Sequence, residues 1–250
     1  MKNLSSSNAD RFITIYNELD EYMRKYLQED ERVPHTELIK KMVQKSSVFN
    51  AHKHELKSFA SLRNAIVHNP DKKNADPIAE PHSAVITRYE SIKNQVLDPP
   101  RALDTIAVKA SNIFIATLNS NALNVMKEMS KNTYTHVPVL DKGVLIGVFS
   151  ESTLFSYIIK NGVLFIEDDV LIKEFEEFIP IDKHESECFE FVSKKALVID
   201  IENIFQIGLK DQKRISVVFI TENGKPKEKI LGMITAWDLA GYNPEGVFNK

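Results

Sequence analysis

Residues 229–242, KILGMITAWDLAGY, repeat the pattern of residues 144–159, VLIGVFSESTLFSYII. Four positions coincide when the two stretches are aligned 85 residues apart: Gly147 with Gly232, Ser150 with Thr235, Thr153 with Asp238, and Leu154 with Leu239. In each stretch, an apolar run typical of a strand is followed by apolar residues at helical spacing. The sequence therefore contains a duplicated strand-to-helix unit.

The duplication extends upstream of these stretches. Residues 136–139 align with residues 214–217 at a separation of 78, and the difference of seven is a longer hairpin loop at residues 221–229. Further upstream, apolar pairs at helical spacing also correspond: Leu123 and Met126 with Ile201 and Ile204. Each repeat is predicted to run strand, helix, strand, turn, strand, helix, and duplication at this length indicates two like units packed together.

This unit resembles a CBS domain, and the pair resembles a Bateman module. The resemblance rests on residues 135–141, THVPVLD, and residues 232–239, GMITAWDL. It implies a tandem β-α-β-β-α pair within residues 101–250, with repeats at about 105–160 and 176–242. It also implies binding of an adenosine ligand, such as AMP, ADP, ATP or a cyclic dinucleotide, in the cleft between the repeats, and a homodimer formed through the CBS domains.

The residues of the duplicated motif suit that chemistry. An Asp at the start of a helix can accept hydrogen bonds from both ribose hydroxyls, and the helix dipole favours its charge. Thr235 offers a hydroxyl to phosphate three residues before Asp238. The first repeat has Ser150, but Thr153 replaces the Asp. We expect one good nucleoside site and a second that is absent or altered; the alternative role of Asp238 is a helix cap.

The residues just before the second strand of each repeat add candidate phosphate ligands. In nucleotide-sensing CBS proteins, His and Arg at these positions hold phosphates, and here the positions carry Thr135-His136 and Lys213-Arg214. Arg can bind phosphate through two parallel hydrogen bonds. The alternative for Lys213-Arg214 is a solvated pair preceding a strand. Trp237 either covers a base or packs; the sequence does not decide.

The first hundred residues are predicted to be helical. All eight glycines lie after residue 142, and glycine is the residue of tight turns, so few hairpins fit before that point. Apolar residues at steps of three and four predict four helices, at about 11–27, 38–43, 52–67 and 81–98, which together make a bundle. The predicted fold class is thus α+β, with the boundary at Pro99-Pro100.

Arg63 lies within the apolar stripe of the third predicted helix. A buried Arg is rare unless it is paired. It either forms an ion pair with an acid of the first helix (Glu18, Asp20 or Glu21), extends to the surface, or binds an anion. The run Leu62-Arg63-Asn64-Ala65-Ile66-Val67-His68-Asn69 resembles the signature of HEPN helical domains, over residues of about 10–98.

Many HEPN domains are metal-independent endoribonucleases whose site lies between two protomers. The resemblance implies that Arg63 binds the scissile phosphate, His68 acts as general acid or base, and Asn64 supports them. Five helical steps of about 100° place Arg63 and His68 about 140° apart, so a working site needs a second protomer.

Composition excludes other classes. A single cysteine, Cys188, rules out a disulfide framework and a cysteine-based zinc site. No Walker A or dinucleotide-binding motif is present, and no metal site is expected. The N-terminus has no signal-peptide pattern, and no apolar run is long enough to span a membrane, which predicts a cytoplasmic protein. The net charge of −3 weakens the case for an RNA partner.

Two functions of different class follow. The first is an adenosine-nucleotide-sensing regulatory protein whose CBS pair controls the helical domain without needing a cofactor. The second is an endoribonuclease gated by the CBS pair, and a non-catalytic interaction scaffold is a third option.

Overall fold

The computed structural model describes residues 7–67, 79–162 and 166–242. It divides into two compact units, Met1–Pro100 and Arg101–Lys250, which are described separately. Within the described residues, every helix is too short or too polar to cross a lipid bilayer.

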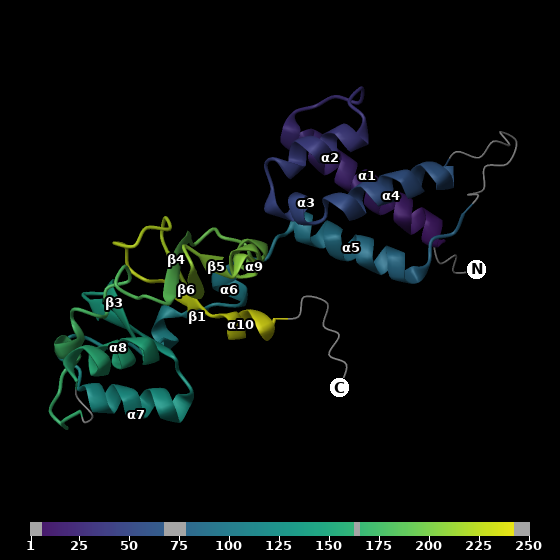
Figure 1. Cartoon of the computed structure of the whole chain (residues 1–250). Helices are drawn as coiled ribbons and strands as arrows, with labels where there is room; N and C mark the ends of the chain where they lie inside the picture. The colour runs from purple at the N-terminus through teal and green to yellow at the C-terminus, as the bar shows by residue number, and fades with distance from the viewer. Residues whose placement is uncertain (1–6, 68–78, 163–165, 243–250) are drawn as a thin grey trace, which may run out of the picture. The chain divides into compact units, whose positions relative to one another are not determined.

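The first unit is entirely helical in its described part (Figure 1). At the start of the first helix, the Ser7 hydroxyl accepts a hydrogen bond from the backbone N–H of Asp10, and the Asp10 carboxylate accepts one from the backbone N–H of Ser7. This arrangement satisfies two free N–H groups of the first turn. The four predicted helices are present, and the structure adds a short one, α3, between the second and third. Their bounds are α1 (Asn8–Leu27), α2 (His35–Val43), α3 (Ser47–Ala51), α4 (Lys53–Val67) and α5 (Ser83–Leu97).

An aromatic cluster holds these helices together. Phe12 of α1, Phe59 of α4 and Tyr89 of α5 lie with ring centroids 4.4–6.0 Å apart. Phe12 and Tyr89 are fully buried. Aromatic side chains bury large areas, so this cluster is the centre of the bundle core.

The second unit is built from two successive repeats of strands and helices. The first repeat contains β1 (Val108–Lys109), α7 (Ala122–Asn132), β2 (His136–Asp141), β3 (Val144–Ser150) and α8 (Glu151–Asn161). It is preceded by α6 (Ala102–Thr105), and short 3-10 turns lie at Ala110–Asn112 and Ile172–Phe175. β2 and β3 form an antiparallel hairpin, and side chains of α7 pack against it in one buried cluster.

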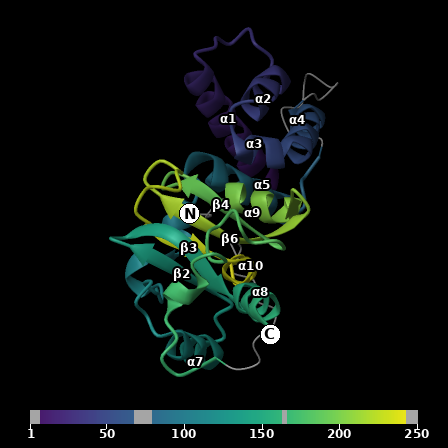
Figure 2. The ribbon, with the colours of Figure 1, turned by 60° about the vertical axis from the view of Figure 1, so that its left-hand side comes forward.

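The second repeat has the same order of main elements, with one additional short strand, β5, after its first helix. It contains β4 (Glu187–Ser193), α9 (Val198–Ile207), β5 (Leu209–Lys210), β6 (Lys213–Thr221), β7 (Gly232–Ile234) and α10 (Ala236–Ala240). β4 pairs with β6 in parallel, and β6 pairs with β7 antiparallel. Figure 2 shows this sheet between α9 and the hairpin of the first repeat. The predicted fold class, helices followed by a duplicated α/β unit, is confirmed.

Strand β6 explains how the two repeats share one core. Side chains on a strand point alternately to its two faces. Val218 and Ile220 pack with helix residues of α6 and α9, whereas Val217 and Phe219 pack with Val148 of the first repeat. All five side chains are buried, so the repeats form one unit.

The first strand of the chain's first repeat belongs to the sheet of the second. β1 pairs antiparallel with β7, with Val108 opposite Met233, and the backbone N–H of Ala110 donates to the carbonyl of Leu231. This exchange brings residues near 108–114 next to the helix start at Thr235. It determines which residues can form a site together.

Candidate ligand-binding site

A pocket of about 630 Å³ lies where the two repeats meet. One wall comes from the first repeat, between β1 and the start of β2, and the other comes from the strand-to-helix turn of the second repeat. The pocket is lined by Val108, Asn112, Ile113, Phe114, Asn132, Thr133, Tyr134, Thr135, His136, Met233, Thr235, Trp237 and Asp238. Four of the predicted ligand-binding residues, Thr135, His136, Thr235 and Asp238, are therefore brought together.

Asp238 is oriented by the turn that starts α10. Its Oδ2 accepts hydrogen bonds from the backbone N–H of Thr235 at 2.7 Å and from the hydroxyl of Thr235 at 2.8 Å. The helix-cap role considered from the sequence is thus present. Oδ1 makes no hydrogen bond to any described residue, and Asp238 is half-buried. Its carboxylate can therefore cap the helix through one oxygen and accept from a ligand through the other.

His136 and Thr135 add polar groups on the opposite wall. The Thr135 hydroxyl lies 2.8 Å from Nδ1 of His136, and Nε2 lies 3.0 Å from a carboxylate oxygen of Glu187. Because a carboxylate only accepts, Nε2 carries the proton of this pair. In the neutral ring, Nδ1 then accepts from the Thr135 hydroxyl, so both ring nitrogens are held and the imidazole is fixed in place.

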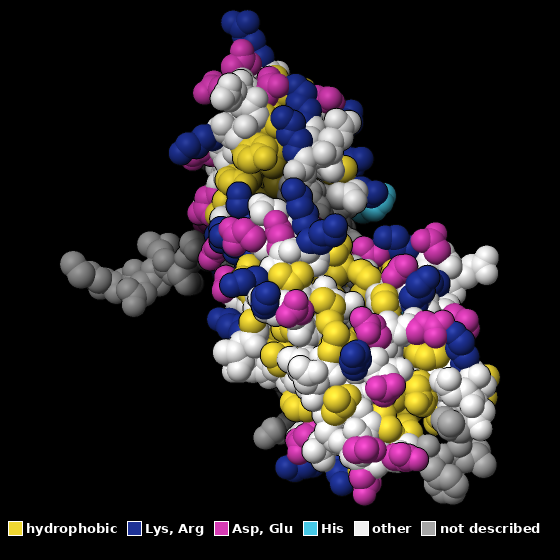
Figure 3. Space-filling model, turned by 90° about the vertical axis from the view of Figure 1, so that its left-hand side faces the viewer, with side chains coloured by type: hydrophobic (Ala, Val, Ile, Leu, Met, Phe, Trp, Pro, Cys, Tyr) yellow, Lys and Arg dark blue, Asp and Glu magenta, His cyan; other side chains and the backbone are white. Residues whose placement is uncertain are grey.

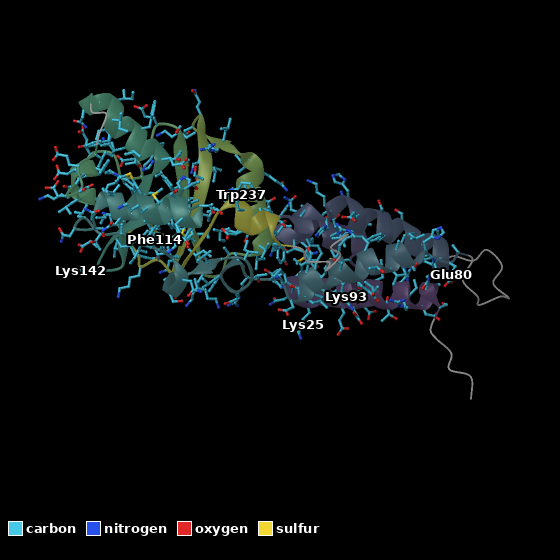
Figure 4. The ribbon with its side chains drawn as sticks, turned by 90° about the horizontal axis from the view of Figure 1, so that it is seen from below. Lys25, Glu80, Lys93, Phe114, Lys142 and Trp237 are labelled. Carbon is cyan, nitrogen blue, oxygen red and sulfur yellow. The ribbon has the colours of Figure 1, made fainter. Side chains whose placement is uncertain are left out.

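Aromatic side chains form the apolar part of the pocket. The rings of Phe114 and Tyr134 stack with centroids 6.1 Å apart and planes 22° apart. Trp237 is 82% exposed, and Figure 4 labels it together with Phe114 from the other repeat. Flat apolar surfaces beside a carboxylate and an imidazole suit a ligand that has a planar base and a polar tail.

The corresponding residues of the first repeat lie in a closed environment. Ser150 and Thr153 are 1% and 2% exposed, and they form the same reciprocal cap at the start of α8. The Ser150 hydroxyl also donates to the carboxylate of Glu187 at 2.8 Å. A second pocket of about 440 Å³ lies between α7 and α8, with Ser150 among its lining residues.

Glu187 is an acid that sequence reasoning did not single out. It is 4% exposed and accepts hydrogen bonds from His136, Ser150, Ser152 and His184. Burial alone would raise the pKa of this carboxyl, but these donors outweigh burial and hold its pKa well below the usual range. No motif marks Glu187 or His184; the only signal is their short spacing before a strand.

The two predicted cations of the second repeat lie apart from the open pocket. Lys213 and Arg214 begin β6 and are not among the described residues that line it. The Lys213 ammonium donates to the backbone carbonyl of His184 at 2.5 Å. Because β1 of the first repeat pairs with β7 of the second, the loop that meets Asp238 is the one carrying Thr135 and His136.

In the first unit, Arg63 is held by an aromatic ring rather than by an acid. Its guanidinium carbon lies 5.2 Å from the ring centroid of Tyr16, within the range of a cation–π contact. Its Nε is buried and has no hydrogen-bond partner within the described residues, and Nη1 contacts the Asn64 amide oxygen at 3.5 Å. The predicted partner His68 lies outside the described residues.

Two of the three acids considered as partners for Arg63 have other contacts, and the third, Glu21, is exposed. Glu18 pairs with Lys93 at 2.8 Å. Asp20 binds Arg24 at 2.6 Å and Nδ1 of His35 at 2.7 Å. His35 stacks on Tyr16, and burial lowers the pKa of this imidazole despite the Asp20 contact. Arg63 therefore lies beside a polar cluster but forms no ion pair within the described part of the chain.

Comparison with known proteins identifies the first repeat. The family model described as the CBS domain matches residues 107–160, and this part of the chain is a CBS domain. No curated protein sequence matches the chain.

Many solved structures are similar to the chain, and three of them show the extent of the likeness. The structure of CBSX2 in complex with AMP has 12% identity and a TM-score of 0.40, covering 56% of this chain and 93% of its own. The structure of CbpB in complex with c-di-AMP has 18% identity and a TM-score of 0.43, and the match covers 60% of this chain and 87% of that one. A conserved CBS domain protein from Thermoplasma acidophilum has 19% identity and a TM-score of 0.38, and the match covers 57% of this chain and 68% of that one.

Proposed function

We propose that the chain is a regulatory protein whose repeat pair binds one adenosine nucleotide in the open pocket and thereby controls the helical first unit. The observation that carries this proposal is the half-buried Asp238 carboxylate facing the pocket, with Oδ1 unused by the described residues. One carboxylate oxygen can accept from the ribose hydroxyls while the other keeps the cap on α10. The CBS identity of residues 107–160 supports adenosine as the nucleoside.

The remaining lining residues have matching roles. Phe114, Tyr134 and Trp237 offer flat surfaces for the base. Thr135 and His136 lie on the other wall; the Thr135 hydroxyl donates its proton to His136, and its oxygen can still accept a hydrogen bond from the ligand. Lys213 and Arg214 are outside this lining and are not assigned to the ligand.

Isothermal titration calorimetry with AMP, ADP, ATP, cyclic di-AMP and S-adenosylmethionine tests the proposal. At least one ligand binds the wild type, and Asp238→Ala weakens it by about 100-fold, because two hydrogen bonds to a charged group are lost. Asp200→Ala is the matched control. Asp200 caps α9 through the same type of contact, to the N–H of Leu197 at 2.9 Å, but it lies outside the pocket lining. Absence of binding by all five ligands contradicts the proposal, as does equal weakening in both variants.

Control of the first unit requires that the ligand binds one state of the protein more tightly than another. Hydrogen exchange of residues 7–67 with and without the bound nucleotide measures this. A ligand-dependent change in protection supports control. Unchanged exchange in the presence of saturating ligand leaves a binding module that acts as an interaction scaffold.

We assign the self-association surface of this protein to α8. Phe155 and Ile159 lie four residues apart on this helix, and both are 66% exposed, so they share one face. Hydrophobic side chains also reach the surface on the face drawn in Figure 3. A homodimer formed through α8 would bury Phe155 and Ile159. Analytical ultracentrifugation is expected to give a dimer for the wild type and a monomer for Phe155→Glu/Ile159→Glu; a wild-type monomer contradicts this assignment.

A second candidate function concerns the first unit. Arg63 has no acidic partner among the described residues and is held by the Tyr16 ring, which leaves its charge available to a phosphate. This favours a metal-independent endoribonuclease in which Arg63 binds the scissile phosphate, His68 transfers the proton, and Asn64 supports them. Cleavage of RNA in EDTA, lost in Arg63→Ala and in His68→Ala but retained in Arg11→Ala, is the expected result. Abolition by EDTA, or activity in either site variant, excludes this function.

A further inference from the structure

The two strand-to-helix turns of the second unit can be superimposed through their glycines. In each repeat, a backbone segment from elsewhere in the chain passes directly over the glycine. A Cβ on Gly147 would lie 2.4 Å from the carbonyl oxygen of Ile179, and a Cβ on Gly232 would lie 3.1 Å from that of Val108. The crossing segments of the two repeats therefore correspond, with Ile179 in the place of Val108.

This correspondence locates the first repeat's counterpart of the open pocket. His184 lies five residues after Ile179, as Ile113 lies five residues after Val108, so His184 takes the place of Ile113. On the helix side, Ser150 and Ser152 take the places of Thr235 and Trp237, which lie 85 residues later. Ser150 and His184 are 1% and 3% exposed. The counterpart is thus lined by polar side chains, of which Ser150 and His184 are almost fully buried and Ser152 is half-buried.

The carboxylate of Glu187 fills this counterpart site. Its Oε1 accepts from Nε2 of His136 at 3.0 Å. Its Oε2 accepts from the hydroxyls of Ser150 at 2.8 Å and Ser152 at 2.6 Å, and from Nδ1 of His184 at 2.9 Å. Both oxygens are therefore saturated with donors, as the oxygens of a bound anionic ligand would be.

The donors come from both repeats. His136 and the two serines belong to the first repeat, and His184 and Glu187 lie at the entry to the second. Nε2 of His184 faces the carbonyl oxygen of Ile179 at 3.3 Å, so each of its nitrogens faces an acceptor. The site thus holds an anion of the chain itself, surrounded by hydrogen-bond donors from both repeats.

We infer that the Glu187 side chain is the built-in occupant of the first repeat's ligand site, in the place that an anionic ligand group would take. Glu187 closes this site to an external ligand and leaves the pocket at Asp238 open to one. This second statement rests on the proposed function. Glu187 is also the link between the sites, since its partner His136 lines the open pocket.

The inference predicts a specific chemical rescue. Replacing Glu187 with Ala removes a CH₂–COO⁻ group, which has the size and charge of acetate. The four donors that face it remain. Removing one partner of a buried charge network strongly destabilises a protein, and for this chain the melting temperature falls by about 10 °C. Acetate then raises the melting temperature of Glu187→Ala progressively with concentration, because a ligand that binds the folded state stabilises it.

Three controls define this effect. In the first control, sodium chloride at equal ionic strength replaces acetate, so that a general effect of salt on the melting temperature is measured separately. Glu190→Ala removes an acid of the same strand β4 that binds Lys210 at the surface, and its melting temperature does not respond specifically to acetate. Glu187→Gln keeps the site filled and also shows no response. Formate rescues less than acetate, and butyrate, which is longer than the deleted group, rescues least.

The outcomes of the rescue experiment are decisive. A specific acetate response of Glu187→Ala supports the inference. If this variant does not fold in buffer, it is refolded in acetate and in chloride, and recovery in acetate alone is equally supportive. If Glu187→Ala has the same melting temperature, or the same recovery on refolding, in acetate as in chloride, the inference is overturned. Glu187 is then only a structural ion-pair partner.

Calorimetry separates this inference from the proposed function. The wild type and Glu187→Gln are each expected to bind one AMP per chain. If the wild type binds two AMP molecules per chain, the inference that Glu187 closes the first repeat's site is overturned, while nucleotide binding by the protein is supported. If none of the five ligands of the previous section binds, the proposed function fails, and the acetate experiment still decides the role of Glu187.

Discussion

In the second repeat, the carboxylate at the strand-to-helix turn belongs to Asp238, whereas in the first repeat Thr153 stands at that position and Glu187 brings a carboxylate from another strand. Asp238 keeps one oxygen free of the described residues, and Glu187 uses both. The same turn therefore supports an open pocket in one repeat and a sealed network in the other. A duplicated motif fixes where a site can form, but the neighbouring chain determines whether it is available.

The largest loss of stability is expected when the aspartate of the open site is introduced at the equivalent position of the closed site. In Thr153→Asp, the new carboxylate lies beside Ser150, which already donates to Glu187, so two like charges share a buried space. Unfolding free energy falls by about 3–5 kcal/mol. Urea unfolding followed by circular dichroism measures this.

The matched control is Thr153→Asn, which has the same size without the charge. The cost of Thr153→Asp decreases in the Glu187→Gln background, where the like charge is gone. A double-mutant cycle that gives no coupling between the two positions contradicts the arrangement.

A smaller difference is expected between the two equivalent glycines. In Gly147→Ala, the new Cβ would overlap the backbone of Ile179 at 2.4–2.7 Å, whereas in Gly232→Ala the contacts begin at 3.1 Å and include the flexible end of Leu103. Overpacking lowers stability by about 1–3 kcal/mol, and the loss for Gly147→Ala is expected at the upper end of this range. Thermal unfolding of the two variants measures the difference; an equal or larger loss for Gly232→Ala contradicts the correspondence of the turns.

The smallest effect is in the acid pH dependence of stability. Glu187 has a folded-state pKa below its ordinary value of 4.5, so its stabilising contribution is complete above pH 4.5 and decreases as the pH falls toward the folded pKa. The decrease is about 1.4 kcal/mol per pH unit. Glu187→Gln lacks this contribution, so the difference between wild type and variant narrows on acidification. A constant difference below pH 4.5 contradicts the depressed pKa.

Much of the second unit was predictable because the repeat is visible in the chain. The glycines at 147 and 232 and the residues after them predicted both turns, and the Thr-to-Asp spacing identified Asp238 as a site candidate. These features depend on residues near one another in sequence, where backbone geometry leaves few choices.

The composition of the pocket could not be read in the same way. Sequence alignment placed Lys213-Arg214 in the same repeat as Asp238, but β1 crosses to pair with β7, and the opposite wall then comes from Thr135 and His136. Glu187 has no motif, and its donors lie 35 to 51 residues earlier or three residues earlier in the chain. Long-range pairing of this kind depends on tertiary packing, which local sequence patterns do not encode.

A crystal structure of the wild-type chain soaked with AMP tests the central claim most directly. The account predicts AMP in the pocket between the repeats, with its ribose hydroxyls on Asp238 and its base against Phe114 or Trp237, and Glu187 unmoved between His136 and His184. AMP bound at Ser150 with Glu187 displaced would contradict the account, as would an AMP molecule whose ribose makes no contact with Asp238.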